Sequence, residues 1–402
     1  MPDLPSAPLD GVRVLELGTM YAAPTAGRML RDFGAEVVKV EDPLRGDTAR
    51  HWQPQKDGLS LGFVRLNAGK RSVGIDLRTA AGRDLVRRLI ADSDVVIESF
   101  RPGRLEKWGL GYDELAGEHP GLILARVSGF GQTGPYRDRP GFGTVAETAS
   151  GFAHLNGWPE TPPTAPPFGF ADSIAGISAA YGVAMALYRR EVTGRGEVID
   201  IALYEPLMFI LGDALLNYTA TGTVMTRHGN ASGAASPRGI YEAADGSWLS
   251  IAASAQTIAM RLFDAMGRPD LKTDDRYATN EARMRNNDAL QDIVREWVHG
   301  RTRDQALATL QDFEVVAAPV NDSRDIVSDP HFLERTLVDM TGTALGDAKM
   351  PGPVLHLAHY AGPTYDGVAR IGEHTREILT RRLGLLPDTL TQLAEDGVIA
   401  TS

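Results

Sequence analysis

Residues 12–40 decide the fold class, and they read VRVLELGTMYAAPTAGRMLRDFGAEVVKV. Residues 12–17 alternate apolar and polar side chains, which predicts a strand that ends at Gly18. A helical spacing continues to about Phe33-Gly34, and residues 35–40 are again typical of a strand. A strand, a helix and a second strand in this order predict parallel strands joined by a right-handed crossover. The sequence therefore predicts an α/β fold built on a parallel sheet.

Further strand-like runs lengthen this sheet. One follows the basic turn at Lys70-Arg71, and the others are residues 95–99, 122–127 and 197–203. Helical spacing over 80–92 and 208–216 supplies crossover helices on the faces of the sheet. The character of the chain then changes near residue 225, where a small and polar segment begins.

A separate small α+β domain is expected from about 225 to 325. Asp245-Gly246 lies between two short strand-like runs and predicts a hairpin. Helical patterns follow at 256–266, 281–299 and 303–313. We expect residues 1–224 to form the N-terminal part of a large Rossmann-like domain, and residues 326–402 to return to it.

Composition and charge restrict the class of protein. The 402 residues are 43% hydrophobic and 23% charged, as in ordinary globular proteins, and their net charge of -11 argues against nucleic acid as a partner. Because cysteine is absent, disulfides, thiolate metal sites and cysteine nucleophiles are excluded. No apolar run approaches a transmembrane span, and Met1-Pro2-Asp3-Leu4 lacks the features of a secretory signal. A cytoplasmic protein is expected, with no membrane partner.

A dinucleotide-binding fingerprint is missing where it would be expected. The turn at 18–24 lacks the GxGxxG spacing. Residues 129–134 match it by letter, but Pro135 and Pro140 follow, so no helix begins there to receive a pyrophosphate. Residues 129–134 are therefore interpreted as a glycine-rich loop.

The segment 166–176, which reads PPFGFADSIAG, delivers one carboxylate to the start of an apolar helix. Apolar residues recur every three or four positions from Ile174 to Tyr188, and Gly194 is a typical helix stop. Asp172 is therefore expected at the N-cap or in the first turn, where free N–H groups favour negative charge. It is either a helix cap or a nucleophilic carboxylate kept ionised by that position.

Motifs in a fixed order carry a family resemblance over nearly the whole chain. They are LDGVRVLEL (9–17), GAEVVKVE (34–41), Asn67 with KRS (70–72), ESFRPG (98–103), GQTGP (131–135), Ala171-Asp172, GRGE (194–197), RHGN (227–230) and GEHT (372–375). This pattern resembles the family III CoA-transferases, the group of formyl-CoA and carnitine CoA-transferases that also contains the α-methylacyl-CoA racemases.

The resemblance implies a fold, an assembly and a reaction. The fold would be a Rossmann-like large domain built from both chain ends plus a small domain, in an interlocked homodimer. In the transferases, the carboxylate at the position of Asp172 attacks the acyl-CoA thioester, and an aspartyl-CoA thioester forms through a mixed anhydride. The acceptor carboxylate then takes the CoA, so an acyl-CoA and a small carboxylic acid would be the partners. No metal and no tightly bound cofactor are expected, because coenzyme A is a substrate.

The resemblance also implies site residues. Asp172 would be the nucleophile, and Gly229 and Asn230 match the glycine loop that shields the activated aspartate from water. Tyr21 stands where a glutamine often contacts that aspartate, and its hydroxyl could donate the same hydrogen bond. Asp42 stands where a basic residue sometimes binds CoA. The expected CoA contacts are Ile75, Arg78, Ser99, Phe100, Arg101 and Lys107.

Several interpretations remain open from the sequence. Lys70, Arg71 and Arg78 could bind phosphate or form a solvated charged rim. Glu147 is interpreted as a solvated or capping residue, with a further acid near the site as the alternative. A racemase or isomerase acting at the α-carbon is the alternative enzyme class, but Gly141-Phe142-Gly143 replaces the His-Asp pair that such enzymes use as a base. A third alternative is a non-catalytic acyl-CoA-binding relative.

Overall fold

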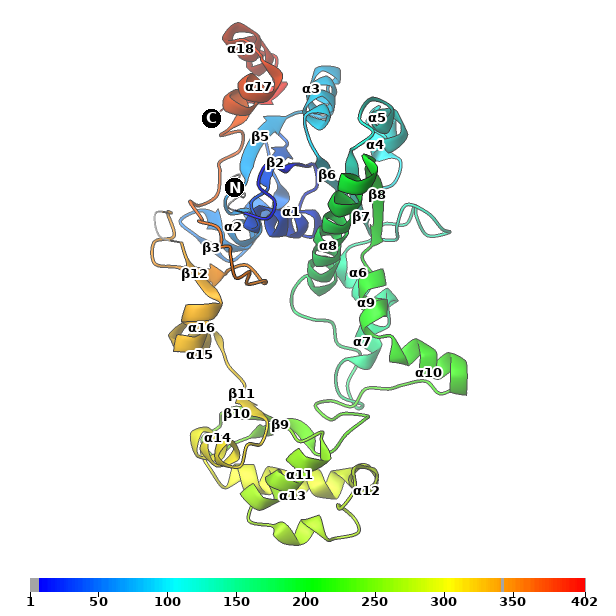
Figure 1. Cartoon of the computed structure of the whole chain (residues 1–402), viewed down its shortest axis with the longest axis vertical. Coiled ribbons are helices and arrows are strands. Elements are labelled where there is room, and N and C mark those ends of the chain that lie inside the picture. Colours follow the sequence, from blue (N-terminus) through cyan, green and yellow to red (C-terminus); the bar gives the residue numbers. More distant parts are fainter. Residues whose placement is uncertain (1–6, 341–342, 402) are drawn as a thin grey trace. The chain divides into compact units, whose positions relative to one another are not determined.

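The computed structural model describes residues 7–340 and 343–401, which form two compact units (Figure 1). Unit 1 contains the described residues within 1–152, 165–215 and 330–402, and unit 2 contains 153–164 and 216–329. Residues 1–4, on which the absence of a secretory signal was judged, lie outside the described residues.

A seven-stranded sheet forms the centre of unit 1. Its strands are β1 (Arg13–Glu16), β2 (Glu36–Glu41), β5 (Arg71–Ile75), β6 (Val95–Glu98), β7 (Ile123–Ser128), β8 (Glu197–Ala202) and β14 (Ile399–Ala400). They lie in the order β14-β5-β2-β1-β6-β7-β8, and every pair is parallel except β14 with β5. From β5 to β8 this is the order of doubly wound sheets, in which the winding reverses between β1 and β6. The predicted α/β fold around a parallel sheet is confirmed.

Helices cover both faces of this sheet because its strands are apolar on both sides. Val14 of β1 packs on one face with α1 (Ala22–Asp32) and α8 (Phe170–Thr193), which lie side by side (Figure 1). The next residue, Leu15, faces the opposite cluster, which contains residues of the helices on the second face. Those helices are α3 (Ala80–Ala91), α4 (Arg104–Lys107), α5 (Tyr112–Glu118), α17 (Thr375–Leu383) and α18 (Pro387–Glu395).

The other elements along the unit 1 segments are short. They are η1 (Thr48–His51), β3 (Gln55–Lys56), β4 (Leu59–Ser60), α2 (Leu61–Asn67), α6 (Gly143–Ala149), α9 (Glu205–Ile210), α16 (Pro330–Arg335), β12 (Leu337–Asp339) and β13 (Lys349–Pro351). Two further helices, α7 (Phe152–Leu155) and α10 (Asp213–Thr221), begin in unit 1 and end in unit 2. The single helix predicted over 208–216 is wrong, because the chain turns at Leu211-Gly212 between α9 and α10.

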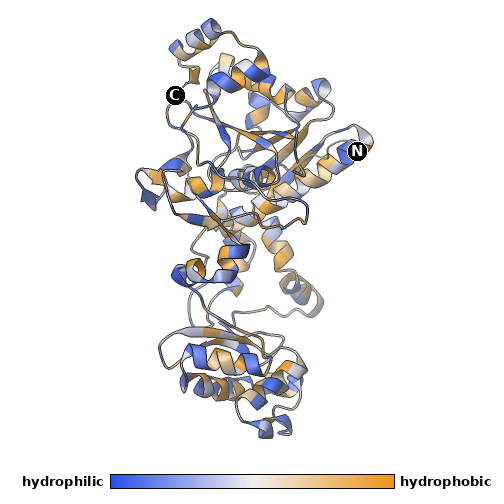
Figure 2. Ribbon diagram, turned by 60° about the vertical axis from the view of Figure 1, so that its left-hand side comes forward, coloured by the Kyte–Doolittle hydropathy of each residue, from blue (hydrophilic) through white to orange (hydrophobic). Residues whose placement is uncertain are grey.

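Unit 2 is a three-stranded antiparallel sheet packed with helices. Its elements are β9 (Arg238–Glu242), β10 (Trp248–Ala252), β11 (Ala317–Pro319), α11 (Gln256–Ala265), η2 (Pro269–Lys272), α12 (Asn280–Arg285), α13 (Asn287–His299), α14 (Arg303–Asp312) and α15 (Ser323–Ser328). The hairpin predicted at Asp245-Gly246 is confirmed by the pairing of β9 with β10. The helix predicted over 281–299 is broken at Asn286, which caps α12. Figure 2 shows hydrophobic and hydrophilic residues alternating along these helices, whose apolar sides form the core.

Helix α8 corrects one statement drawn from the sequence. An 18-residue window of this 24-residue helix has a mean hydropathy of 1.4, so by length and composition alone the helix could cross a membrane. Buried core helices of water-soluble proteins satisfy the same criterion, and 44% of the apolar window is buried in unit 1. The absence of a membrane partner therefore stays a prediction.

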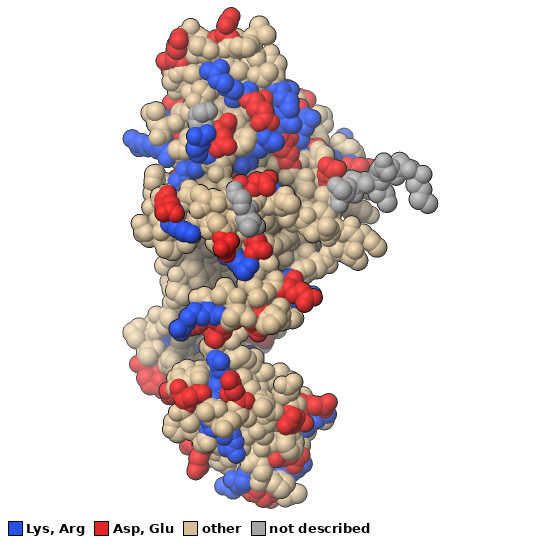
Figure 3. All heavy atoms as spheres, turned by 90° about the vertical axis from the view of Figure 1, so that its left-hand side faces the viewer, with Lys and Arg blue, Asp and Glu red and all other residues tan. Residues whose placement is uncertain are grey.

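Several charged residues expected at the surface are instead buried or paired. Lys70 is 4% exposed, and its Nζ atom lies 2.7 Å from Oε2 of Glu16. Burial lowers the pKa of Lys70 to about 8. Lys70 is thus neither a phosphate ligand nor part of a solvated rim. At the surface, acidic and basic side chains are interspersed on the face drawn in Figure 3.

Candidate active site

A cavity of about 660 Å³ opens at the carboxyl ends of β1, β6, β7 and β8. This edge, beside the reversal between β1 and β6, is where doubly wound sheets bind ligands. Residues that follow four of the strands line the cavity, and they include Thr19, Tyr21, Ser99, Gly129 and Leu203. The N–H of Thr19 donates to Oγ of Ser99 at 3.3 Å and so joins the ends of β1 and β6.

Asp172 brings a carboxylate to this cavity from the first turn of α8, as predicted. Its side chain lies against Gly143, the first residue of α6, so closely that a Cβ atom there would be 2.0 Å from Oδ2. Only glycine leaves room for the carboxylate in this place. The N-cap residue of α8 is Gly169 and Asp172 is the third residue of the helix, so Asp172 is not at the cap position.

Glu147 caps α8 instead. Its Oε1 atom accepts the N–H groups of Phe170 and Ala171 at 3.1 and 3.2 Å, and its side chain is buried. The capping interpretation of Glu147 is confirmed, whereas a solvated position is wrong. The free N–H groups of this helix were expected to favour the charge of Asp172, but Glu147 accepts hydrogen bonds from two of them.

Two effects therefore make the ionised form of Asp172 less stable relative to the protonated form. Burial, and after it the negative charge of Glu147, raise the pKa of Asp172 to about 6. The helix N-terminus was expected to keep this carboxylate ionised, but desolvation and the neighbouring acid outweigh that effect. Asp172 is thus charged at neutral pH and takes up a proton in mildly acidic solution.

Tyr21 lies beside Asp172 across Gly169. A Cβ atom at Gly169 would be 3.1 Å from Cε2 of Tyr21 and 3.2 Å from Oδ2 of Asp172. The distance between Cε2 of Tyr21 and Oδ2 of Asp172 is therefore no greater than the sum of these two distances. Arg65 donates to the Tyr21 hydroxyl oxygen at 2.5 Å, which leaves the hydroxyl proton free to be donated onward. The rings of Tyr21 and Trp52 are 6.1 Å apart, and both line the cavity.

The residues expected to bind CoA are not all gathered in this cavity. Ser99 lines it, while Phe100 is half-buried and packs edge-to-face on Trp108. Arg101 and Lys107 are exposed after β6, and neither has an ion pair within the described part of the chain.

Neither of the two CoA contacts expected at the end of β5 has a side chain that is free to bind a ligand. The Ile75 side chain is 1% exposed and belongs to the core, so only its main chain could meet a ligand. Arg78 is paired with Asp76 at 2.7 Å and with Asp42 at 3.1 Å, so a phosphate would have to compete with both carboxylates. Asp42, which stands where a basic residue sometimes binds CoA, thus has a partner within the chain.

Gly229 and Asn230 belong to unit 2, so their action on Asp172 stays a prediction. Gly229 has φ of +59°, and a Cβ atom there would be 2.2 Å from Cε3 of Trp158. Its N–H donates to the carbonyl of Gly157 at 2.9 Å. The glycine loop is therefore shaped by its contact with the 157–158 segment, and Asn230 lines a cavity of about 380 Å³ within unit 2.

Sequence reasoning missed several residues of the site. Trp52, Arg65 and Met20 approach the cavity or its walls without belonging to any motif that was recognised. The described residues contain no group of three or more His, Asp or Glu side chains arranged to hold a metal ion. The described residues that line the main cavity include no histidine.

Comparison with known proteins identifies the class. The sequence profile of CoA-transferase family III matches residues 9–375. The succinyl-CoA–D-citramalate CoA-transferase of Chloroflexus aurantiacus is 44% identical over 98% of this chain and 99% of its own length. The succinate–glutarate CoA-transferase of Agrobacterium fabrum is 35% identical over 94% of this chain and 97% of its own length. A CaiB/BaiF family protein from Brucella suis has a crystal structure with a TM-score of 0.83 and 35% identity, covering 94% and 99% of the two chains.

The fold and these relatives define an acyl-CoA:carboxylate CoA-transferase. The chain belongs to CoA-transferase family III. The resemblance noted in the sequence is confirmed, and the non-catalytic alternative is not supported.

Gly143→Ala tests the close approach of the carboxylate. The added methyl group must displace the end of a side chain rather than backbone, so we expect the melting temperature to change little. The displaced carboxylate should lower CoA-transfer activity by about 100-fold, as misplaced catalytic groups do. Gly117→Ala, where a Cβ atom meets nothing within 4 Å, is the matched control and should keep full activity. Full activity in Gly143→Ala would contradict this geometry.

The pH dependence of kcat/KM tests the raised pKa of Asp172. A carboxylate that attacks must be ionised, so activity should fall below about pH 6. Glu147→Gln keeps an oxygen for the helix N–H groups but removes the charge, so the acid limb should move to lower pH. Because Asp172 stays buried in this variant, the pH at which kcat/KM falls should remain above the ordinary pKa range of aspartate. An unmoved limb would show that Glu147 does not influence Asp172; Glu118→Gln, which alters an exposed acid, is the control.

Proposed function

We propose that this enzyme moves CoA from an acyl-CoA donor to a carboxylic acid acceptor through an aspartyl-CoA thioester on Asp172. The observation that supports it best is the position of Asp172, which lines the cavity at the carboxyl edge of the sheet and lies against Gly143, where a side chain would collide with its carboxylate. Carboxylate nucleophiles divide a difficult transfer into easier steps.

The steps balance without a redox partner. An Asp172 oxygen attacks the thioester carbonyl, the C–S bond breaks, and CoA leaves as a thiolate. A mixed anhydride between Asp172 and the donor acyl group remains. The thiolate attacks the Asp172 carbonyl, which releases the donor acid and forms aspartyl-CoA. The acceptor carboxylate attacks the carbonyl carbon of this thioester, the C–S bond breaks, and a second mixed anhydride forms between Asp172 and the acceptor. The released thiolate attacks the acceptor carbonyl of this anhydride, which gives the acceptor acyl-CoA and breaks the bond to the Asp172 oxygen. Asp172 returns to a free carboxylate, and no net proton is consumed.

Neighbouring groups have roles in this scheme. Tyr21 would donate its hydroxyl proton to the oxyanion, because Arg65 already donates to its oxygen. Gly229 and Asn230 would cover the anhydride and exclude water. Ser99, Phe100, Arg101 and Lys107 would hold CoA, with Arg78 and the Ile75 main chain at the end of β5. No tightly bound cofactor is needed in this scheme.

The names of the relatives support a substrate class. One is named for succinyl-CoA and citramalate and another for succinate and glutarate. We therefore expect succinyl-CoA as donor and a short dicarboxylic acid as acceptor. The Arg65 guanidinium, which touches Tyr21, has no carboxylate partner among the described residues and could meet the distal carboxylate.

A homodimer of interlocked subunits is part of the proposal, and a cytoplasmic location is expected for it. Helix α8 leaves one apolar stripe exposed along its length, formed by Ile177, Tyr181, Met185, Tyr188 and Val192. The spacing of three or four residues places them on one face. Apolar surface of this extent marks an interaction surface, and a second copy of the chain would cover it.

Trapping of the covalent intermediate tests the mechanism. After incubation with succinyl-CoA and hydroxylamine, peptide mass mapping should find a hydroxamate at Asp172. The label should be absent in Asp172→Ala and retained in Glu147→Gln, which preserves the nucleophile. If CoA transfer proceeds while Asp172 stays unmodified under all conditions, the aspartyl mechanism is wrong. Exchange of the α-proton with deuterated water would instead favour the isomerase alternative.

Sedimentation equilibrium tests the assembly. The wild-type chain should sediment as a dimer, and the combination Tyr181→Glu with Tyr188→Glu should weaken or abolish the dimer, because it places charge on the apolar stripe. Leu44→Glu changes an equally exposed apolar residue outside α8 and is the control. A monomeric wild-type chain at micromolar concentration would contradict the proposal.

A further inference from the structure

Met20, at the edge of the candidate site, has an unusual backbone. Its φ of +70° lies in the left-handed region, which residues with a side chain rarely adopt. It follows the end of β1, directly precedes Tyr21 and lines the cavity. A conformation of this kind persists only where the surrounding structure imposes it, and such residues concentrate at functional sites.

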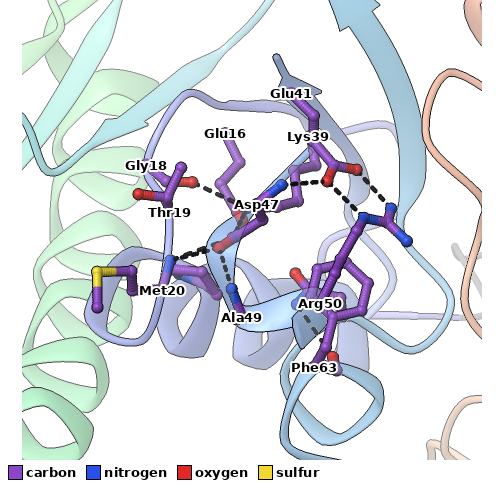
Figure 4. A network of polar contacts seen from close by, with 12 residues as sticks. Glu16, Gly18, Thr19, Met20, Lys39, Glu41, Asp47, Ala49, Arg50 and Phe63 are labelled. Atoms are coloured by element: carbon purple, nitrogen blue, oxygen red, sulfur yellow. Dashed lines mark hydrogen bonds and ion pairs between the residues drawn. The ribbon is translucent and has the colours of Figure 1, made fainter. Parts of the chain in front are cut away.

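Asp47 supplies the contact that holds Met20. Both of its carboxylate oxygens accept the N–H of Met20 at 3.1 Å (Figure 4). Its Oδ1 atom also accepts the N–H of Ala49 at 2.9 Å and so caps η1. Trp52 follows η1 directly and lines the same cavity as Met20. One buried carboxylate therefore connects two segments of the cavity wall.

Lys39 fixes the position of Asp47. Its Nζ atom is 2.9 Å from Oδ2 of Asp47, 2.9 Å from Oε1 of Glu16 and 2.9 Å from the carbonyl oxygen of Gly18 (Figure 4). Burial opposes charge on both partners, but their attraction lowers the pKa of Asp47 and raises that of Lys39. Both groups are thus charged, and the Gly18–Met20 segment is held at its two ends.

We propose that Asp47 is a positioning residue of the transferase: by holding Met20 in the left-handed conformation and capping η1, it sets Tyr21 and Trp52 as walls of the cavity beside Asp172. The Tyr21 and Trp52 rings, 6.1 Å apart, come from the two segments that Asp47 joins. The inference rests on the proposed function, because it assigns a role in CoA transfer. Asp47 is fully buried and does not line the cavity, so it acts through other residues.

A double-mutant cycle separates this role from simple stabilisation of the fold. Asp47→Asn places an amide against Lys39 and should lower kcat for CoA transfer from succinyl-CoA by about 30-fold, since small displacements at a site are costly. In the Met20→Gly background the left-handed conformation needs no support, because glycine adopts it freely. There Asp47→Asn should cost less than about fivefold. Equal losses in both backgrounds would overturn the proposal.

Asp32→Asn is the matched control. Asp32 is another buried carboxylate with a cationic partner, Arg28, whose Nε is 2.7 Å away, but it lies at the other end of α1 from Tyr21. This variant should lose thermal stability and keep kcat within about twofold of the wild type. A loss of kcat as large as that of Asp47→Asn would reduce the role of Asp47 to stability alone and would overturn the proposal.

A measurement of stability keeps the proposal testable if Asp47→Asn does not fold. Met20→Gly should melt at a higher temperature than Met20→Ala, because alanine bears the left-handed strain and glycine does not. A melting temperature for Met20→Ala that equals or exceeds that of Met20→Gly would overturn the proposal. This comparison needs no enzymatic activity, so it stays informative if the wild-type protein fails to transfer CoA and the proposed function is wrong.

Discussion

The interaction of Lys39 with Glu16 and Asp47 is the constraint on which much of unit 1 depends. These three residues are almost completely buried, and burial of charge is costly unless every charge has close partners. Lys39 meets two carboxylates and a carbonyl, and Lys70 satisfies the remaining oxygen of Glu16. The network joins β1, β2 and the segment leading into η1. Removal of one member would leave a neighbouring buried charge with one partner fewer, so the stability of this part of the fold and the shape of the cavity wall depend on the same contacts.

The opposite side of the cavity has the reverse character. Asp172 and Glu147 bring two carboxylates together with little compensation, and the helix N–H groups are used by the residue that does not line the cavity. Such an arrangement costs stability and keeps a reactive oxygen accessible. The sheet compensates for this loss of stability, because its strand ends hold α8 and the loop after β1 at fixed places.

Local patterns allowed much of this structure to be predicted. The alternation in residues 12–17, the spacing after Ile174 and the Asp245-Gly246 turn each indicate a structure that forms within a few residues. What the sequence could not predict depends on contacts between distant segments. Examples are the burial of Lys70 against Glu16, the capping of α8 by Glu147 and the pairing of Arg78 with Asp42. No local rule places a methionine in the left-handed region, so Met20 was unpredictable.

Strand β5 pairs with β2 on one side and with β14 on the other, and β14 lies more than three hundred residues further along the chain. During synthesis that second edge of β5 has no strand partner until residues 399–400 leave the ribosome, which at 5–20 residues per second takes roughly 15 to 65 s. An open edge recruits other strands. A nascent or truncated chain that lacks β14 therefore exposes a strand edge that β14 covers in the folded protein. Such a chain is prone to aggregate until β14 has joined the sheet.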